Sequence, residues 1–138
     1  MAADALHTFG AITLSGGAGT VYCADEFNLG DIDDRYRYSK YHLGGMVRDL
    51  ALEIIITTAL ASGTSVQFFW ASDTTETSTT KILTFDVVAT ATGVIGYRMV
   101  YPVPWECARY NRVGAVIVGA MDAGIAYAKM VHGPNLDR

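Results

Sequence analysis

The feature that most constrains the fold of this chain is an unbroken run of β-branched residues, Ile54-Ile55-Ile56-Thr57-Thr58. Branching at Cβ restricts the side-chain torsion χ1 against a helical turn and suits a pleated strand. Within residues 50–60, alternate positions share one face, which is apolar apart from Thr58 and carries Leu50, Leu52, Ile54, Ile56 and Leu60. The other face carries Glu53 and Thr57. We therefore predict a core-facing strand over these residues.

The residues that follow predict a hairpin and then a series of further strands. Turn residues occupy positions 61–64. In residues 65–71, the side chains at even positions (Val66, Phe68 and Trp70) alternate with those at odd positions, as in the returning strand of a hairpin. Further strands are predicted at 81–88, 94–101, 108–118 and 124–131. Strands at this spacing, with no amphipathic helix between them, favour a sandwich or barrel. We predict an all-β fold, a jelly-roll-like antiparallel β-sandwich with an extended N-terminal arm and one long loop.

The beginning of the chain is less regular than the rest. Glycines at 16, 17 and 19 separate two short apolar pieces, so residues 1–24 are predicted to form an extended N-terminal arm. Residues 25–138 then form a single domain, because a chain of 138 residues can bury one sizeable core. The polar residues 72–80 are expected to form a solvated loop, with a flexible contact loop as the alternative.

Composition and charge limit the classes of partner. The net charge of −4 argues against direct binding of nucleic acid, which usually requires a basic face. We expect no membrane span, because the longest apolar stretch falls short of the roughly 20 residues that a span needs. The N-terminus does not resemble a secretory signal, so we expect production in the cytoplasm. Cys23 and Cys107 lack CxxC spacing and predict buried thiols rather than a zinc site or a disulfide.

The sequence contains no recognisable motif for catalysis or metal binding. The glycines at 16–19 lack the Lys-Ser/Thr pair of a phosphate loop, and the three histidines lie in separate regions. The acids of 31–34 are followed by Arg35 and Tyr36, where a calcium loop needs an oxygen ligand and a glycine. We therefore predict no catalytic residue, cofactor or metal. An enzyme on this scaffold stays open, because separate carboxylates could meet in space, namely those of Asp25, Glu26, Glu53, Asp86 and Glu106.

The most suggestive stretch interleaves aromatic and basic side chains, at Arg35, Tyr36, Arg37, Tyr38, Lys40, Tyr41 and His42. Tyrosine and arginine combine apolar area with hydrogen bonding and are enriched at protein interfaces. Stacking on nucleic acid is one alternative. A solvated loop with its tyrosines folded back on the sandwich is another. The overall acidity favours the protein interface.

Several short signatures carry a resemblance to a known family. They are Phe27-Asn28-Leu29-Gly30, residues 50–58, residues 63–73, Tyr101-Pro102-Val103-Pro104, residues 108–113 and Ala123-Gly124-Ile125. Together they resemble the capsid cement (decoration) proteins of tailed bacteriophages over residues 27–131. The insert at residues 31–46 departs from the family pattern.

The resemblance implies a jelly-roll protein that sits on the outer surface of the phage head, oligomerises and clamps neighbouring major capsid subunits. It implies no catalytic residue. We expect capsid contacts from the arm 1–24 and the loop 31–42, and a homo-oligomer, a dimer ahead of a trimer. Its interface is expected at Phe69 or along a glycine-containing strand with Val113, Val116 and Val118. The alternative function is a carbohydrate-binding β-sandwich module whose sugar platform contains Trp70, Trp105 and tyrosines.

Overall fold

A computed structural model describes residues 5–28, 50–104 and 107–132 of the chain. Nine strands account for most of these residues: β1 (Ala5–Thr13), β2 (Gly19–Tyr22), β3 (Phe27–Asn28), β4 (Leu50–Ser62), β5 (Ser65–Asp73), β6 (Lys81–Ala89), β7 (Arg98–Pro102), β8 (Tyr110–Val118) and β9 (Met121–His132). The described part is all-β, as predicted. It contains no helix that is long and apolar enough to cross a membrane.

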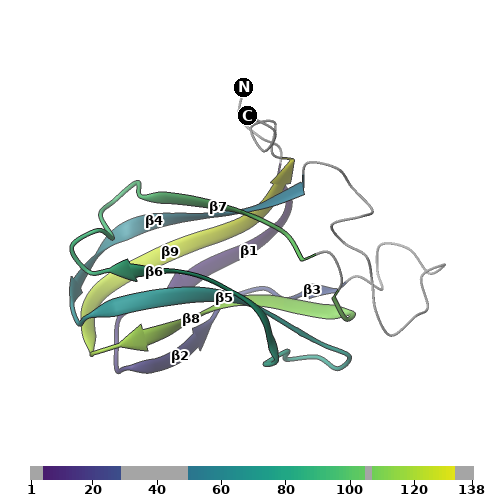
Figure 1. Cartoon of the computed structure of the whole chain (residues 1–138), viewed down its shortest axis with the longest axis horizontal. Helices are drawn as coiled ribbons and strands as arrows, with labels where there is room; N and C mark the ends of the chain where they lie inside the picture. Colours follow the sequence, from purple (N-terminus) through teal and green to yellow (C-terminus); the bar gives the residue numbers. More distant parts are fainter. Residues whose placement is uncertain (1–4, 29–49, 105–106, 133–138) are drawn as a thin grey trace.

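The strands form two antiparallel sheets that pack face to face (Figure 1). Sheet A has the order β1-β9-β4-β7, and sheet B has the order β2-β8-β5-β6 with β3 also paired to β8. Apart from the β2–β3 and β5–β6 connections, each step along the strand series passes from one sheet to the other. This double Greek-key path is that of a jelly roll. The predicted fold class is therefore confirmed.

The predicted hairpin between residues 50–60 and 65–71 is wrong. β4 lies in sheet A and β5 lies in sheet B, so the turn at residues 62–64 carries the chain across the sandwich. Ser62 and Gly63 adopt positive φ angles of 60° and 64° there. A Cβ on Gly63 would lie 2.7 Å from Met121 Cγ, so the crossing depends on a close approach. Apolar alternation is the same for a hairpin and for a crossing, and only packing distinguishes the two.

The predicted extended arm is also corrected for residues 5–24. β1 pairs with β9 over most of its length, and β2 pairs with β8. Phe9, Ile12 and Leu14 are fully buried in the common core. These residues belong to the sandwich because their alternate apolar side chains fill the space between the sheets.

The later strands agree with their predicted ranges within a few residues, except that 94–97 precede β7 as turns. The predicted core face of β4 is confirmed at Leu52, Ile54, Ile56 and Leu60, while the side chain of Leu50 lies outside the described residues. Cys23 and Cys107 are both buried thiols that form no disulfide, as predicted. Burial raises the pKa of the Cys23 thiol against the opposing effects of its hydrogen bonds and of Arg112.

The centre of the core is aromatic. Trp70 is fully buried, and the ring of Phe9 meets it edge-on with 5.4 Å between centroids. The indole Nε1–H of Trp70 donates to Asn111 Oδ1 at 2.8 Å, and Asn111 is itself fully buried. A buried donor without a partner costs about 1–3 kcal/mol, so this hydrogen bond makes the deep position of the indole tolerable.

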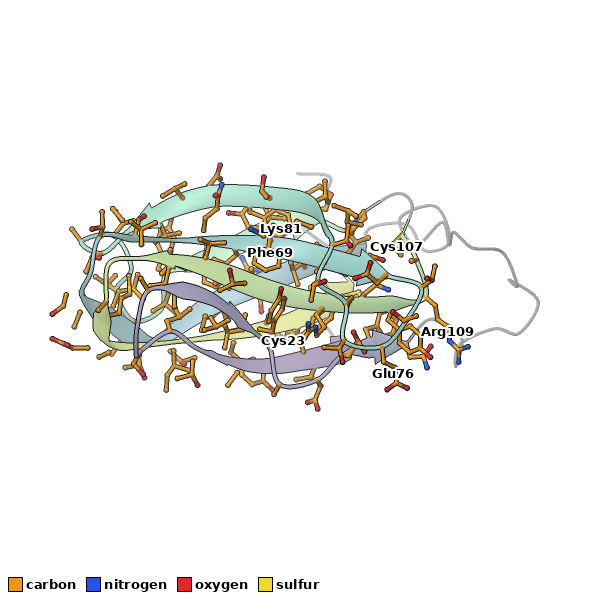
Figure 2. All side chains as sticks on the ribbon, turned by 90° about the horizontal axis from the view of Figure 1, so that it is seen from below. Cys23, Phe69, Glu76, Lys81, Cys107 and Arg109 are labelled. Carbon is orange, nitrogen blue, oxygen red and sulfur yellow. The ribbon has the colours of Figure 1, made fainter. Side chains whose placement is uncertain are left out.

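Phe69 is buried although it points away from the core. Its neighbours Phe68 and Trp70 occupy the core cluster, so alternation turns Phe69 to the outer face of sheet B. There the ring lies over Gly114, and only 1% of the residue is exposed. Tyr22 meets the Phe69 ring edge-on, with 5.6 Å between the ring centroids. The Lys81 ammonium sits 4.9 Å from the Phe69 centroid (Figure 2).

Replacing Gly114 with alanine should destabilise the fold. A Cβ at this position would lie 2.4 Å from Phe69 Cζ and 2.8 Å from the backbone oxygen of Val21, so both the ring and β2 must shift. We expect Gly114→Ala to lower the free energy of unfolding by about 2 kcal/mol in urea denaturation. Gly17→Ala is the matched control, because a Cβ there meets nothing within 4 Å. Equal stability of the two variants would contradict the packing described for Phe69.

Candidate functional site

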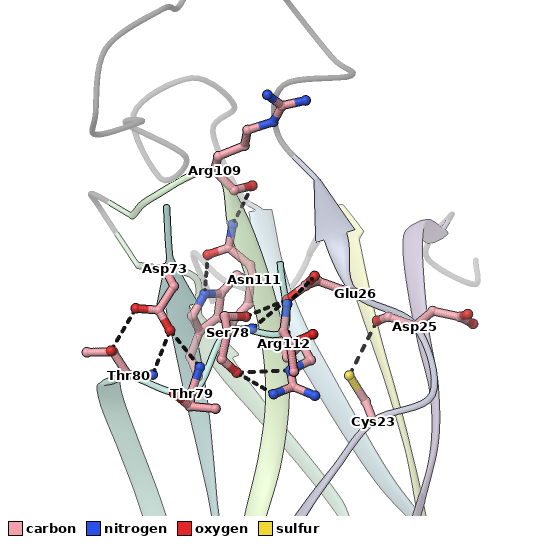
Figure 3. Close-up of polar contacts among 12 residues, drawn as sticks. Cys23, Asp25, Glu26, Asp73, Ser78, Thr79, Thr80, Arg109, Asn111 and Arg112 are labelled. Atoms are coloured by element: carbon pink, nitrogen blue, oxygen red, sulfur yellow. Dashed lines mark hydrogen bonds and ion pairs between the residues drawn. The ribbon is translucent and has the colours of Figure 1, made fainter. Parts of the chain in front are cut away.

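One end of the sandwich carries a group of polar contacts that fixes the β5–β6 loop, residues 74–80. We call Glu26, Asp73, Ser78 and Arg112 the loop clamp (Figure 3). Glu26 Oε1 accepts a hydrogen bond from the Thr77 amide at 3.0 Å. Its Oε2 accepts two more, from the Ser78 amide at 2.8 Å and from Ser78 Oγ at 2.7 Å. The segment between β2 and β3 thereby holds a loop that lies about fifty residues away in the sequence.

Arg112 on β8 holds the same loop from the other side. Its Nε and Nη2 donate to the carbonyl oxygen of Ser78 at 2.9 and 2.6 Å, and its Nε lies 3.8 Å from Glu26 Oε2. The guanidinium also stacks 3.8 Å from the centroid of the Tyr22 ring. Ser78 is completely buried as a result, with its amide, hydroxyl and carbonyl all bonded.

Asp73 closes the loop at the end of β5. Its carboxylate accepts from the amides of Thr79 and Thr80 at 2.7 and 3.1 Å and from Thr80 Oγ at 2.7 Å. These bonds, led by that from Thr79, hold the pKa of Asp73 below its ordinary value. Residues 74–77 form the exposed tip, and Thr77 adopts a positive φ of 64°. Residues 77–80 of the loop are therefore held by hydrogen bonds, while the tip faces solvent.

The clamp acids are acceptors of structural hydrogen bonds rather than proton donors. Partial burial pushes the pKa of Glu26 upward, but the bonds from Ser78 and Thr77 and the charge of Arg112 prevail and lower it below 4.5. A general acid at neutral pH needs the opposite shift. Glu53 lies elsewhere, on the outer face of sheet A between Arg98 and Lys129. Asp86 lies near the hydroxyl of Tyr101, at 3.5 Å.

Metal-ligating side chains are likewise dispersed. Among residues 5–28, 50–104 and 107–132, no three His, Cys, Asp or Glu side chains come close enough to hold a metal ion together. The acids at 31–34 lie outside the described residues.

A second feature is a set of exposed apolar side chains at one margin of the sandwich. We call Ile82, Leu83, Val87, Val94 and Ile95 the edge patch. The first three lie on β6, the end strand of sheet B in the described part, and the others lie in the segment that leads to β7. Their exposed fractions run from 37% for Leu83 to 71% for Ile95. Clustered exposed apolar side chains mark surfaces for protein contacts more often than scattered ones do.

The residues predicted for capsid contact lie outside the described residues, namely Arg35, Tyr36, Arg37, Tyr38, Lys40, Tyr41 and His42. Of those predicted for the subunit interface, Val113 is fully buried in the core and Phe69 is covered by its own neighbours. Val116 is half-buried on the outer face of sheet B, and Val118 is 52% exposed there. The predicted interface is therefore reduced to the last two, where it stays a prediction.

Of the two tryptophans predicted for a sugar platform, Trp70 is not accessible to a ligand. Trp70 is fully buried and bonded to Asn111, so its ring cannot stack on a sugar in this fold. Trp105 lies outside the described residues.

Sequence reasoning missed both the clamp and the edge patch. The clamp joins residues from three distant segments, and no local spacing reveals it. The edge patch had a signal that was available: residues 82–88 read Ile-Leu-Thr-Phe-Asp-Val-Val, which breaks the alternation of a strand with one solvated face.

Comparison with known proteins adds no assignment. No protein-family model matches the chain, and no curated protein matches its sequence.

The clamp predicts a pH dependence of stability. Because the folded pKa of Glu26 is depressed, its contribution is fully present above the ordinary value of 4.5 and is lost as the pH falls through the folded pKa. Glu26→Gln should lower the free energy of unfolding by about 1 kcal/mol at neutral pH, since the site is partly exposed. The difference from wild type should shrink below pH 4.5 in urea denaturation. Glu76→Gln, at the exposed tip of the same loop, should show neither effect. A difference for Glu26→Gln that does not change with pH would contradict the role of its charge.

Proposed function

We propose that this protein is a capsid cement (decoration) protein of a tailed phage. It is a virion structural protein that is made in the host cytoplasm, binds the outer surface of the head and clamps neighbouring major capsid subunits. The resemblance of its short signatures to that family is one support. The jelly-roll path of the strands is a second, because it agrees with the fold that the resemblance implies. The same fold hosts many functions, so it does not carry the proposal alone.

The observation that carries the proposal is the edge patch. A cement protein acts by touching other protein surfaces, and Val87, Val94 and Ile95 are each more than half exposed at one margin. Charged side chains dominate an ordinary solvated margin, whereas the core of a protein interface is depleted of them. Among the nine residues of β6 only Lys81 and Asp86 are charged.

The loop clamp suits the same role. A contact loop that is ordered before binding loses little conformational entropy when it binds. Residues 74–77 project from a loop that Glu26, Asp73 and Arg112 already hold. The tip therefore offers the shell a surface that needs no rearrangement.

In the proposed mechanism, each cement subunit adds contacts between neighbouring capsomers. A cement subunit that spans two capsomers must be detached before they separate under the outward pressure of packaged DNA. Weak single contacts become strong when an oligomer makes several, because later contacts form at high effective concentration. Many copies on one head multiply the effect.

The test is co-sedimentation of the purified protein with expanded phage heads that lack their decoration, together with the temperature at which the heads are disrupted. We expect saturable binding that raises this temperature. A folded protein that does not bind the heads would contradict the proposal, and binding of that protein to a glycan array would favour the carbohydrate-binding module.

The predicted contact segment is tested in the same assay. We expect the triple substitution Tyr36→Ser, Tyr38→Ser and Tyr41→Ser to weaken head binding at least 10-fold, as the loss of aromatic anchors does at other interfaces. Tyr127→Ser is the control, because Tyr127 is a tyrosine on β9 that is 40% exposed. Undiminished binding by the triple variant would remove this segment from the contact without removing the function.

A further inference from the structure

The described part of the outer face of sheet A carries three charged side chains, which lie next to one another. They are Glu53 on β4, Arg98 on β7 and Lys129 on β9, and we call them the sheet A charge group. Because β4 lies between β7 and β9, the carboxylate is at the centre of the group. Arg98 Nε donates to Glu53 Oε2 at 2.5 Å, and Lys129 Nζ lies 3.5 Å from Glu53 Oε1.

The acid of this group is buried, whereas its two cations are partly exposed. The side chain of Glu53 is 9% exposed, that of Arg98 is 48% exposed and that of Lys129 is 32% exposed. The group is net positive, although the other charged side chains of the described part are three cations and six acids. A molecule that approaches this face therefore meets N–H donors and a positive charge, on a chain whose net charge is −4.

Arg98 retains the part of its guanidinium that best recognises a carboxylate. Glu53 accepts from Nε, and no side chain in the described part of the protein accepts from Nη1 or Nη2. These two terminal nitrogens form a planar fork that matches the two oxygens of a carboxylate. Lys129 also retains donors, because an ammonium has three N–H groups. The exposed polar atoms of the group thus require a ligand that supplies anionic acceptors.

The side chains around the group are uncharged. Ile55 lies opposite Arg98 in the strand register, and Val100 lies opposite Glu53. Thr8 lies opposite Lys129 on the other side. All three residues are half-buried. An arginine beside partly buried apolar side chains is a common composition at the centre of protein interfaces.

We propose that this face docks an extended acidic segment of a partner protein, whose carboxylates bind the Arg98 fork and Lys129. The backbones of β7 and β9 are roughly 10 Å apart, with β4 between them, and both side chains reach toward Glu53. In an extended segment, alternate side chains share one face and are about 6.7 Å apart. Two acids separated by one residue therefore fit the two cations.

A protein segment suits this face better than a free anion does. A single ion pair at an exposed site contributes little, because water competes for both charges. A segment with two acids makes its second contact at a high effective concentration. Glu53 already holds both cations, so less side-chain entropy is lost when the segment binds. The site lies on sheet A, whereas β6 belongs to sheet B, and the inference does not rest on the proposed function.

The first experiment measures the fluorescence anisotropy of a labelled peptide in which glutamate and alanine alternate, titrated with the full chain at low salt. The control peptide has the same composition, but pairs of glutamates alternate with pairs of alanines, so no two acids are separated by one residue. We expect saturable binding of the alternating peptide, and binding of the control peptide that is at least about 5-fold weaker. General charge attraction does not distinguish the two peptides.

Variants then test the fork. Arg98→Lys keeps the charge and the pair with Glu53 but has no fork, so we expect at least about 10-fold weaker binding of the alternating peptide. Glu53→Gln/Arg98→Gln should weaken binding to a similar extent, since it removes the fork without changing the net charge or leaving a buried carboxylate unpaired. Glu76→Gln/Arg109→Gln is the matched control, because it removes the same two residue types at exposed positions (Figure 2). It should bind as wild type. Thermal unfolding confirms that each variant is folded.

Four outcomes would overturn the inference. The wild-type protein does not bind the alternating peptide, or it binds the two peptides equally well. Alternatively, Arg98→Lys binds the alternating peptide as tightly as wild type. Finally, heparin or vesicles of anionic lipid bind more tightly than the alternating peptide and lose this binding in Arg98→Lys, which would assign the face to a different polyanion.

Discussion

The buried indole of Trp70 and its hydrogen bond to Asn111 link β5 to β8. Among the described residues, Trp70 is the largest fully buried side chain, and Asn111 accepts its N–H between the sheets. Asn111 in turn donates to the carbonyls of Ala108 and Arg109, and the hydroxyl of Ser72 accepts the amide of Ala108. One buried hydrogen bond therefore aligns β5 with β8 and fixes the chain where it enters β8. Replacing either partner would leave a buried polar group unsatisfied.

In the loop clamp, at one end of the sandwich, hydrogen bonds likewise satisfy a buried polar residue. Ser78 is buried because Glu26 and Arg112 together satisfy its amide, hydroxyl and carbonyl. The ion pair between Glu26 and Arg112 is long, at 3.8 Å, so the shared bonds to Ser78 matter more than the direct attraction of the two charges. The exposed, threonine-rich tip of the loop is therefore flanked by residues that these hydrogen bonds hold in place.

The two edges of sheet B differ in length and in the character of their side chains. The β2–β3 margin is short and broken, and the β6 margin is long and apolar. Phe69 shows that the outer face of the sheet can cover its own aromatic side chain, by laying it over Gly114 beneath Tyr22 and Lys81.

The sequence by itself determined the class of the fold, the strands after residue 50 and the core face of β4, because alternation and branching at Cβ act within a few residues. It could not determine whether β4 and β5 form a hairpin or cross the sandwich, since both arrangements bury the same side chains. It also left residues 5–24 as an arm, although Phe9, Ile12 and Leu14 are core residues. Short strands acquire their stability from partners such as β9, which lies more than a hundred residues along the chain. The clamp and the edge patch were decided by tertiary structure alone, because burial and exposure depend on which distant strands come to lie beside each residue.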